Sequence, residues 1–341
     1  MLIRLIFGFA AAAAMSIGAL AHHSVAGNFN PGMTIEVEGE ITGIHWRNPH
    51  VKFTMLVTGD GGEQEQWEVE THSLSIMRRM AAIDPFVEIG DRVRAAGWPA
   101  LRSPHGMFVN NMLLPSGEEF VFRFSPEPAD LRWSDRLWGT NDRWFAEAGD
   151  PSGAEQGIFK VWSTTLAGGQ GFFWLPEYPL TEAARASFAE YNPVVDDPLL
   201  NCGIKGMPPI MGAPYPIEFV DEGATIVLRL EEYDLRRMID MESQDENPEP
   251  SILGYSTGHW EGDTLVVETT AINYGYFTTN GIPLSDEVEI IERFTPSEDA
   301  SELAYEITVI DPATFSEPVV MDKTWVWLPD VRIAPYECDE G

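Results

Sequence analysis

Polar and apolar side chains alternate in short runs through the first third of the chain. Residues 34–41 read Thr-Ile-Glu-Val-Glu-Gly-Glu-Ile, which has the period of two expected of a half-buried strand. Further strands, separated by Asp-Gly, Gly-Asp and Ser-Gly turns, are predicted over 51–57, 64–70, 91–96 and 107–113. One helix is predicted over 73–83, with Leu74, Met77 and Met80 on one face. Short strands around a single helix predict a small closed barrel of the OB type.

The strand pattern returns after residue 202 and continues without helical crossovers. The predicted strands cover 217–220, 225–231, 235–241, 264–269, 287–294, 303–310 and 319–327. Asn280-Gly281 and Glu261-Gly262-Asp263 are typical turn sequences between them. This series predicts an antiparallel β-sandwich or an up-and-down barrel. The fold class is therefore mostly β, with a small OB-like barrel followed by a second β domain.

The segment between the two β regions has a different composition. Prolines and glycines interrupt it, yet it carries tryptophans at positions 133, 138, 144, 162 and 174. A flexible linker would not carry so many tryptophans, so we expect an ordered connector packed across both domains. Residues 158–164 are predicted as the first strand of the second domain, and a helix is predicted from an N-cap at Thr181. The predicted divisions are 1–21, 22–123, 124–180 and 181–341.

The start of the chain has the pattern of a secretory signal peptide. Arg4 precedes an apolar run over 5–20, and Ala19-Leu20-Ala21 has the small-x-small form of a cleavage site. The run is shorter than the roughly 20 apolar residues of a comfortable membrane span. We therefore expect cleavage after Ala21, a periplasmic or secreted protein and no membrane span, with an uncleaved anchor as the alternative. The mature chain would begin with His22-His23.

Charge and cysteine usage narrow the partners and the compartment. The chain has 54 acidic and 21 basic residues and a net charge of −33, which argues against nucleic acid and anionic membrane surfaces as partners because both would repel it. The only cysteines are Cys202 and Cys338, and they form no C-x-x-C motif. They predict a structural disulfide. It would close a loop of 136 residues (338 − 202), worth on the order of 4–5 kcal/mol.

Histidines gather in the N-terminal region. Six of the seven fall between residues 22 and 105. Imidazole is the commonest transition-metal ligand, and an N-terminal His22 would add its α-amine. These residues predict a copper site in which His22 chelates the ion and His23, His50 or His72 supplies a third nitrogen. The alternative is that the same rings pack, cap turns and form hydrogen bonds inside the small barrel.

The second domain offers one histidine beside carboxylates. His259 lies in the sequence Gly-His-Trp-Glu-Gly-Asp, and Glu231 and Arg236 lie on or beside predicted strands. A histidine and a carboxylate in one cavity could transfer protons or activate water, which makes these three residues the catalytic candidates. The alternative is purely structural: a hairpin turn at 261–263, a core anchor at Trp260, and cross-strand ion pairs of Arg236-Arg237 with Glu231-Glu232. The chain contains no G-x-S-x-G, H-E-x-x-H or phosphate-binding glycine loop.

Several motifs resemble uncharacterised exported bacterial proteins. The N-terminal half resembles the exported domain-of-unknown-function family numbered 6152, through Ala-His-His-Ser at 21–24, Trp-Arg-Asn-Pro-His at 46–50, Gly39, Ile44, Gly90-Asp91 and Gly97-Trp98-Pro99. The second half is similar to exported β proteins that carry a Cys-to-Pro block, here 202–216, an E-x-x-x-x-R-R-x-I-type strand, here 232–239, and a Trp-Glu-Gly-Asp-Thr-Leu-Val-Val block, here from 260. The resemblance implies export and this architecture, and it carries no activity or catalytic residues.

Two functions follow as hypotheses. The leading one is a periplasmic binding protein with a histidine copper site in the small barrel and an apolar or small ligand in the C-terminal β domain. The competing one is a cofactor-free hydrolase, lyase or isomerase with its site around His259, Glu231 and Arg236. An envelope scaffold without a ligand is the third alternative.

Overall fold

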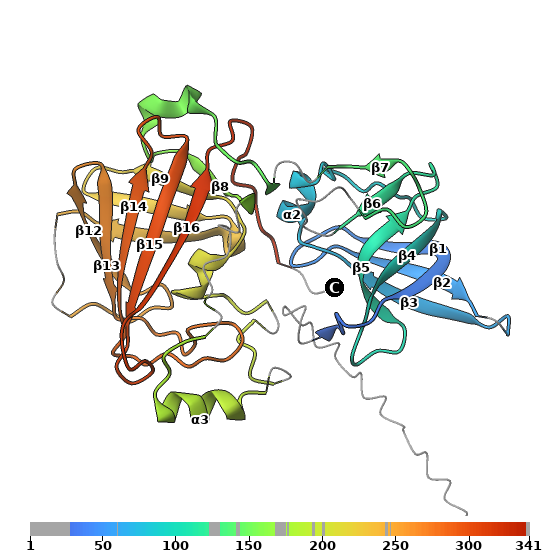
Figure 1. Cartoon of the computed structure of the whole chain (residues 1–341), viewed down its shortest axis with the longest axis horizontal. Helices are drawn as coiled ribbons and strands as arrows, with labels where there is room; N and C mark the ends of the chain where they lie inside the picture. The colour runs from blue at the N-terminus through green and yellow to red at the C-terminus, as the bar shows by residue number, and fades with distance from the viewer. Residues whose placement is uncertain are drawn as a thin grey trace, which may run out of the picture.

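The computed structural model describes residues 28–59, 61–122, 130–140, 144–167, 175, 177–192, 195–199, 202–242, 245 and 247–338. These residues form two β-barrels that stand side by side in Figure 1. The predicted signal peptide, His22 and His23 lie outside the described residues.

The N-terminal barrel has the strand order of an OB fold. Its strands are β1 (Ile35–His45), β2 (Lys52–Thr58), β3 (Gln64–Glu70), β4 (Arg92–Pro99) and β5 (Gly106–Leu113). The sheet runs β3-β2-β1-β4-β5, and a parallel pairing of β3 with β5 closes it. Two short strands, β6 (Glu119–Val121) and β7 (Leu137–Trp138), extend it beyond β5. The predicted OB-like barrel is therefore confirmed.

The helix α2 (Leu74–Arg79) lies between β3 and β4 and is shorter than predicted. The expected helix over 73–83 stops because Ala81 takes a left-handed backbone conformation with φ of 70° and Pro85 follows shortly after. The apolar face was correctly predicted, since Met77 and Met80 are fully buried in the barrel core and Leu74 packs against it.

The C-terminal domain is a closed barrel and not a sandwich. The barrel order is β10-β11-β12-β13-β14-β15-β16-β8-β9, and β9 pairs with β10 to close it. Among its described strands only β11 and β12 pair in parallel. The strands are β8 (Val161–Thr164), β9 (Ile217–Asp221), β10 (Thr225–Leu230), β11 (Leu235–Asp240), β12 (Tyr255–Glu261), β13 (Thr264–Thr270), β14 (Glu289–Pro296), β15 (Glu302–Ile310) and β16 (Val319–Val326).

One strand of this barrel was not predicted. Strand β12 shows no apolar alternation, because its one buried residue is the polar Ser256. Its central Gly258 is required by close packing, since a Cβ atom there would lie 2.7 Å from Ile239 Cγ2. The hairpin turn predicted at 261–263 is present, with Gly262 at φ of 62° and Glu261 paired with Thr264. Trp260, expected to be a core anchor, is 43% exposed.

The connector contributes to both cores. Trp144 is buried in the N-terminal core, whereas Trp162 on β8 is buried in the C-terminal core. The helix α3 (Glu182–Glu190) begins as predicted, because the Thr181 hydroxyl accepts a hydrogen bond of 3.1 Å from the Ala184 N–H. Short 3₁₀ helices η2 (Pro151–Gln156), η4 (Pro209–Gly212) and η5 (Glu232–Asp234) complete the set. Within the described part of the chain, no helix has the length and apolarity needed to cross a membrane.

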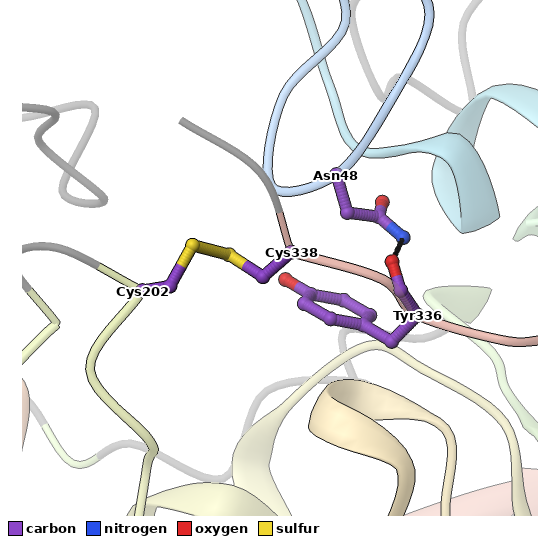
Figure 2. Close-up of a disulfide and its surroundings, with 4 residues drawn as sticks. All are labelled: Asn48, Cys202, Tyr336 and Cys338. Atoms are coloured by element: carbon purple, nitrogen blue, oxygen red, sulfur yellow. Dashed lines mark hydrogen bonds between the residues drawn. A yellow bond between two sulfur atoms is a disulfide. The ribbon is translucent and has the colours of Figure 1, made fainter. Parts of the chain in front are cut away.

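The chain that follows β16 passes from the C-terminal barrel to the N-terminal barrel (Figure 1). We call its residues 328–338 the C-terminal tail. The predicted disulfide is present, and it joins Cys338 of the tail to Cys202, with 6.1 Å between their Cα atoms. Figure 2 shows this disulfide beside Asn48 of the N-terminal barrel.

Candidate functional site

His50 and Glu70 meet at one end of the N-terminal barrel. His50 lies just before β2, and Glu70 is the last residue of β3, which pairs with the start of β2. The Nδ1 atom of His50 contacts the Glu70 carboxylate, and both side chains are largely buried. A carboxylate on Nδ1 orients the imidazole and favours the tautomer in which Nε2 carries the lone pair.

His72 lies in the neighbouring loop, between β3 and α2. Its Nε2 atom is 2.6 Å from the carbonyl oxygen of Phe122. Burial lowers the pKa of His72 to about 4, although the Phe122 carbonyl acts in the opposite direction, and nearby His50 lowers the pKa further. His72 is therefore neutral at pH 7, and a neutral ring that donates from Nε2 carries its lone pair on Nδ1.

The ring of Phe108 and the backbone hold the two histidine loops together. Phe108 on β5 meets both rings edge to face, with centroid distances of 6.3 Å to His50 and 5.1 Å to His72. The Val51 N–H donates to the His72 carbonyl at 3.0 Å, so the two loops are adjacent. Phe29 lies 5.6 Å from Phe108 on the same barrel, which brings the start of the described chain to this end as well.

Asn48 fastens the same two loops. It precedes His50 by two residues, and its Oδ1 atom accepts a hydrogen bond of 3.0 Å from the Leu74 N–H, two residues after His72. Asn48 is only 1% exposed, so both loops are fixed by a buried amide. The Trp-Arg-Asn-Pro-His motif thus supplies one candidate ligand and the residue that positions it.

The described residues provide only part of a metal site. No group of three or more histidine, cysteine, aspartate or glutamate side chains among them is placed to hold a metal ion. Of the predicted ligands, the structure brings His50 and His72 together, while His22 and His23 fall outside its described ranges. His105 lies apart as an exposed loop residue against Trp67 and Glu65.

The catalytic candidates of the second domain do not form one site. His259 is 53% exposed at its side chain and lies 3.4 Å from Glu261, its neighbour on β12. Arg236 is exposed on β11 and pairs with Glu222. Glu231 is buried, and it accepts a hydrogen bond from the Ala334 N–H of the C-terminal tail. The three residues therefore lie in three separate environments. The structural alternative, ion pairs of Arg236-Arg237 with Glu231-Glu232, is also contradicted, because Arg236 pairs with Glu222 and Arg237 with Glu292.

The sequence reasoning missed an ionic cluster inside the C-terminal barrel. Arg237 on β11 forms a bidentate pair with Glu292 on β14, and Arg237 is 1% exposed. Its remaining donors reach the Ser256 hydroxyl at 3.0 Å and the Thr269 hydroxyl at 2.6 Å. The Tyr305 hydroxyl donates to Glu292 at 2.8 Å. This pair is enclosed and well hydrogen-bonded, which is the arrangement of a structural ion pair.

Lys323 on β16 is a second buried charge in the same barrel. Its ammonium donates to the Met211 carbonyl at 3.3 Å and lies 4.4 Å from the centre of the Trp325 ring. Burial lowers the pKa of Lys323 to about 7. The sequence alone could have indicated these inward-facing charges. Alternate residues of a strand face the same side, and on that side apolar residues lie before and after each of Arg237, Glu292 and Lys323.

The barrel interior itself is filled by side chains, among which the largest fully buried ones include Trp162, Phe294 and Trp325. A cavity of about 660 Å³ lies beside α3, and its walls include Tyr178, Phe188 and Ile282. This cavity has the size of a small-molecule pocket. It lies apart from the buried ionic cluster, so the two features do not form one site.

Comparison with known proteins identifies one part of the chain. Residues 11–108 match the model described as "Family of unknown function (DUF6152)". No curated protein matches the chain. The matched segment holds His50, Glu70, His72 and Asn48 and ends at Phe108, so it contains the whole histidine group and none of the C-terminal barrel.

Proposed function

We propose that this is an exported copper-binding protein of the periplasm, in which His50, His72 and the amine and imidazole of His22 hold the ion. His23 is the additional donor next in sequence. The observation that carries the proposal is the pair of oriented histidines at one end of the N-terminal barrel, His50 on Glu70 and His72 on the Phe122 carbonyl.

The partners of the two rings support metal binding over simple packing. Histidine ligands of metal ions almost always donate their other ring N–H to a carboxylate, a backbone carbonyl or water. His50 has the carboxylate and His72 has the carbonyl. The low pKa of His72 keeps that ring in the neutral form that can coordinate a metal.

Chain length allows the proposed N-terminal donors to reach the pair. Phe29 packs on Phe108, whose ring contacts both His50 and His72. His22 precedes Phe29 by seven positions in the chain. A fully extended stretch of that length covers at most about 25 Å. The chain is therefore long enough for the amine and imidazole of His22 to reach both rings after cleavage at Ala21.

The electrostatics of the chain also favour a cation over an anion as the ligand. A net charge of −33 raises the local concentration of cations near the surface and repels anions. Nitrogen donors select copper among the divalent ions of the first transition row, since copper stands highest in their order of affinity. The proposal is for binding and carries no assigned reaction.

The test is calorimetric titration of Cu(II) into protein that begins at His22. We expect one ion per chain. Binding should be at least about 10-fold weaker when the α-amine of His22 is acetylated, because that nitrogen then has no lone pair to give and loss of a ligand costs no less than loss of a residue that orients one. His50→Ala and His72→Ala should weaken binding in the same range. His259→Ala is the matched control, since this exposed histidine lies on the other barrel. Equal binding by every variant would contradict the proposal.

A further inference from the structure

We infer that the C-terminal tail is a strap that positions the two histidine loops, so that the Cys202–Cys338 disulfide sets the copper affinity of the site. This inference rests on the proposed function. It assigns a positioning role to Asn48, to the Tyr336 backbone and to the disulfide, in a region where the two barrels meet.

The tail is anchored on the C-terminal domain at several points. The Ala334 N–H donates to Glu231 at 3.0 Å, and the Tyr336 N–H donates to the Asp234 carboxylate at 3.1 Å. The Tyr336 ring packs on two tyrosines of that domain, 5.5 Å from Tyr215 and 4.9 Å from Tyr233 between ring centres. Two residues further, Cys338 is covalently bound to Cys202. These contacts fix the position of the tail on the C-terminal domain.

The same tail residues hold the N-terminal barrel through Asn48. The Asn48 Nδ2 donates to the carbonyl oxygen of Tyr336, as the dashed line in Figure 2 shows. Asn48 also forms an isolated parallel β-bridge with Cys338. The disulfide therefore lies directly next to the contact between the barrels, and Figure 2 shows Cys338 between Cys202 and this contact.

Asn48 passes this constraint to both candidate ligands. Its backbone leads to His50 two residues later, and its Oδ1 atom holds the N–H of Leu74, two residues after His72. A single buried amide thus joins three segments, namely the tail and the two histidine loops. Losing one of its partners would leave a buried polar group unsatisfied, which destabilises the arrangement.

Opening the disulfide releases the end of the strap. A dithiol reductant would supply two electrons and two protons, leaving two cysteine thiols and the oxidised dithiol. Cys338 would then be held only by noncovalent contacts such as its bridge to Asn48. The contact of Asn48 with the tail would then rest on the noncovalent anchors of Tyr336 alone, and the loops of His50 and His72 would gain freedom. The oxidised chain is therefore the form with high copper affinity.

The experiment compares Cu(II) titrations of three proteins that begin at His22. They are the wild type, Asn48→Ala and the double variant Cys202→Ser/Cys338→Ser, in which serine avoids any binding of copper by free thiols. We expect each change to weaken copper binding about tenfold or more, as for other residues that orient ligands. Combined in one protein, the changes should weaken binding no more than the stronger one alone, because they break one contact chain.

A control and a metal-free measurement separate the possible failures. Asn111→Ala removes another buried amide of the N-terminal barrel, which bonds Glu119 and Asp130, and should leave copper affinity unchanged. Hydrogen exchange of backbone amides at 48–51 and 72–74 should be faster in both test variants without copper. Circular dichroism confirms that each variant folds. If the wild type binds no copper, the proposed function fails. If it binds and both test variants bind equally well with unchanged exchange, the strap inference is overturned and the proposed function stands.

Discussion

The two barrels bury ionisable side chains in opposite ways. In the C-terminal barrel, Arg237 and Glu292 point inward from the middle of strands, and hydrogen bonds and an opposite charge surround both. In the N-terminal barrel, His50 and His72 stand in loops at one end, where the Glu70 carboxylate contacts the first ring and the Phe122 carbonyl contacts the second. Enclosure on all sides is the arrangement of a structural ion pair, whereas the two oriented rings are metal ligands under the proposed function.

Removing a side chain from each barrel should therefore have different effects on stability and on ligand binding. Truncating one member of a buried ion pair leaves an uncompensated charge and acts on stability. Truncating a histidine at a loop acts on the ligand and changes packing less. The predictions below use this difference, from the largest expected effect to the smallest.

The largest effect is expected from Arg237→Met. This variant leaves Glu292 charged inside the barrel, so the free energy of unfolding should fall by about 3–5 kcal/mol. Denaturant unfolding followed by tryptophan fluorescence measures it, since Trp325 lies in the same core. The double variant Arg237→Met/Glu292→Leu should recover most of the loss. A single variant as stable as the wild type would show that the pair is not a structural element.

A smaller effect, visible as a pH dependence, is expected from Lys323. Its pKa in the folded protein is about 7, whereas an unfolded lysine has a pKa near 10.4. The unfolded chain therefore binds more protons between these values, and stability rises with pH. From pH 7 to pH 9 this group should add about 2 kcal/mol to the free energy of unfolding. Denaturation of wild type and Lys323→Met at both pH values measures the difference, and parallel behaviour of the two would contradict the assignment.

The smallest effect on stability is expected at Glu70, which orients His50. Glu70→Gln keeps an acceptor for the ring but removes the charge, so copper binding should weaken about tenfold. Its free energy of unfolding should change by less than about 1 kcal/mol, in contrast with Glu292→Gln, which leaves Arg237 without its counter-charge. Titration and denaturation of both variants decide the point. Equal losses of stability would remove the distinction between the barrels.

Alternation of side chains predicted most of the fold. The sequence predicted the five strands β1–β5 of the OB barrel and eight of the nine strands of the C-terminal barrel. Strand β12 was not predicted because its inward residue, Ser256, is polar and accepts a hydrogen bond from Arg237. The choice between sandwich and barrel was open, since the pairings of β8 with β9 and of β8 with β16 depend on contacts distant in sequence.

The candidate site was predictable in part. Residue type and spacing identified His50 and His72, but their partners Glu70 and Phe122 come from pairing across the barrel. The role of Asn48 depends on Tyr336, which lies 288 residues away in sequence, so no local pattern could indicate it. In the second domain, the alternation of β11 places Arg237 inward with Leu235 and Ile239 and Arg236 outward, so the prediction of Arg236 as a site residue disagreed with the pattern of its own strand.

The central claim is that His50 and His72 both bind the copper ion. The most direct measurement is pulsed electron paramagnetic resonance of Cu(II)-loaded protein that begins at His22, which detects the remote nitrogens of coordinated imidazoles. The account predicts that His50→Ala and His72→Ala each remove one imidazole signal while His259→Ala leaves the spectrum unchanged. Identical spectra for all of these proteins would contradict it.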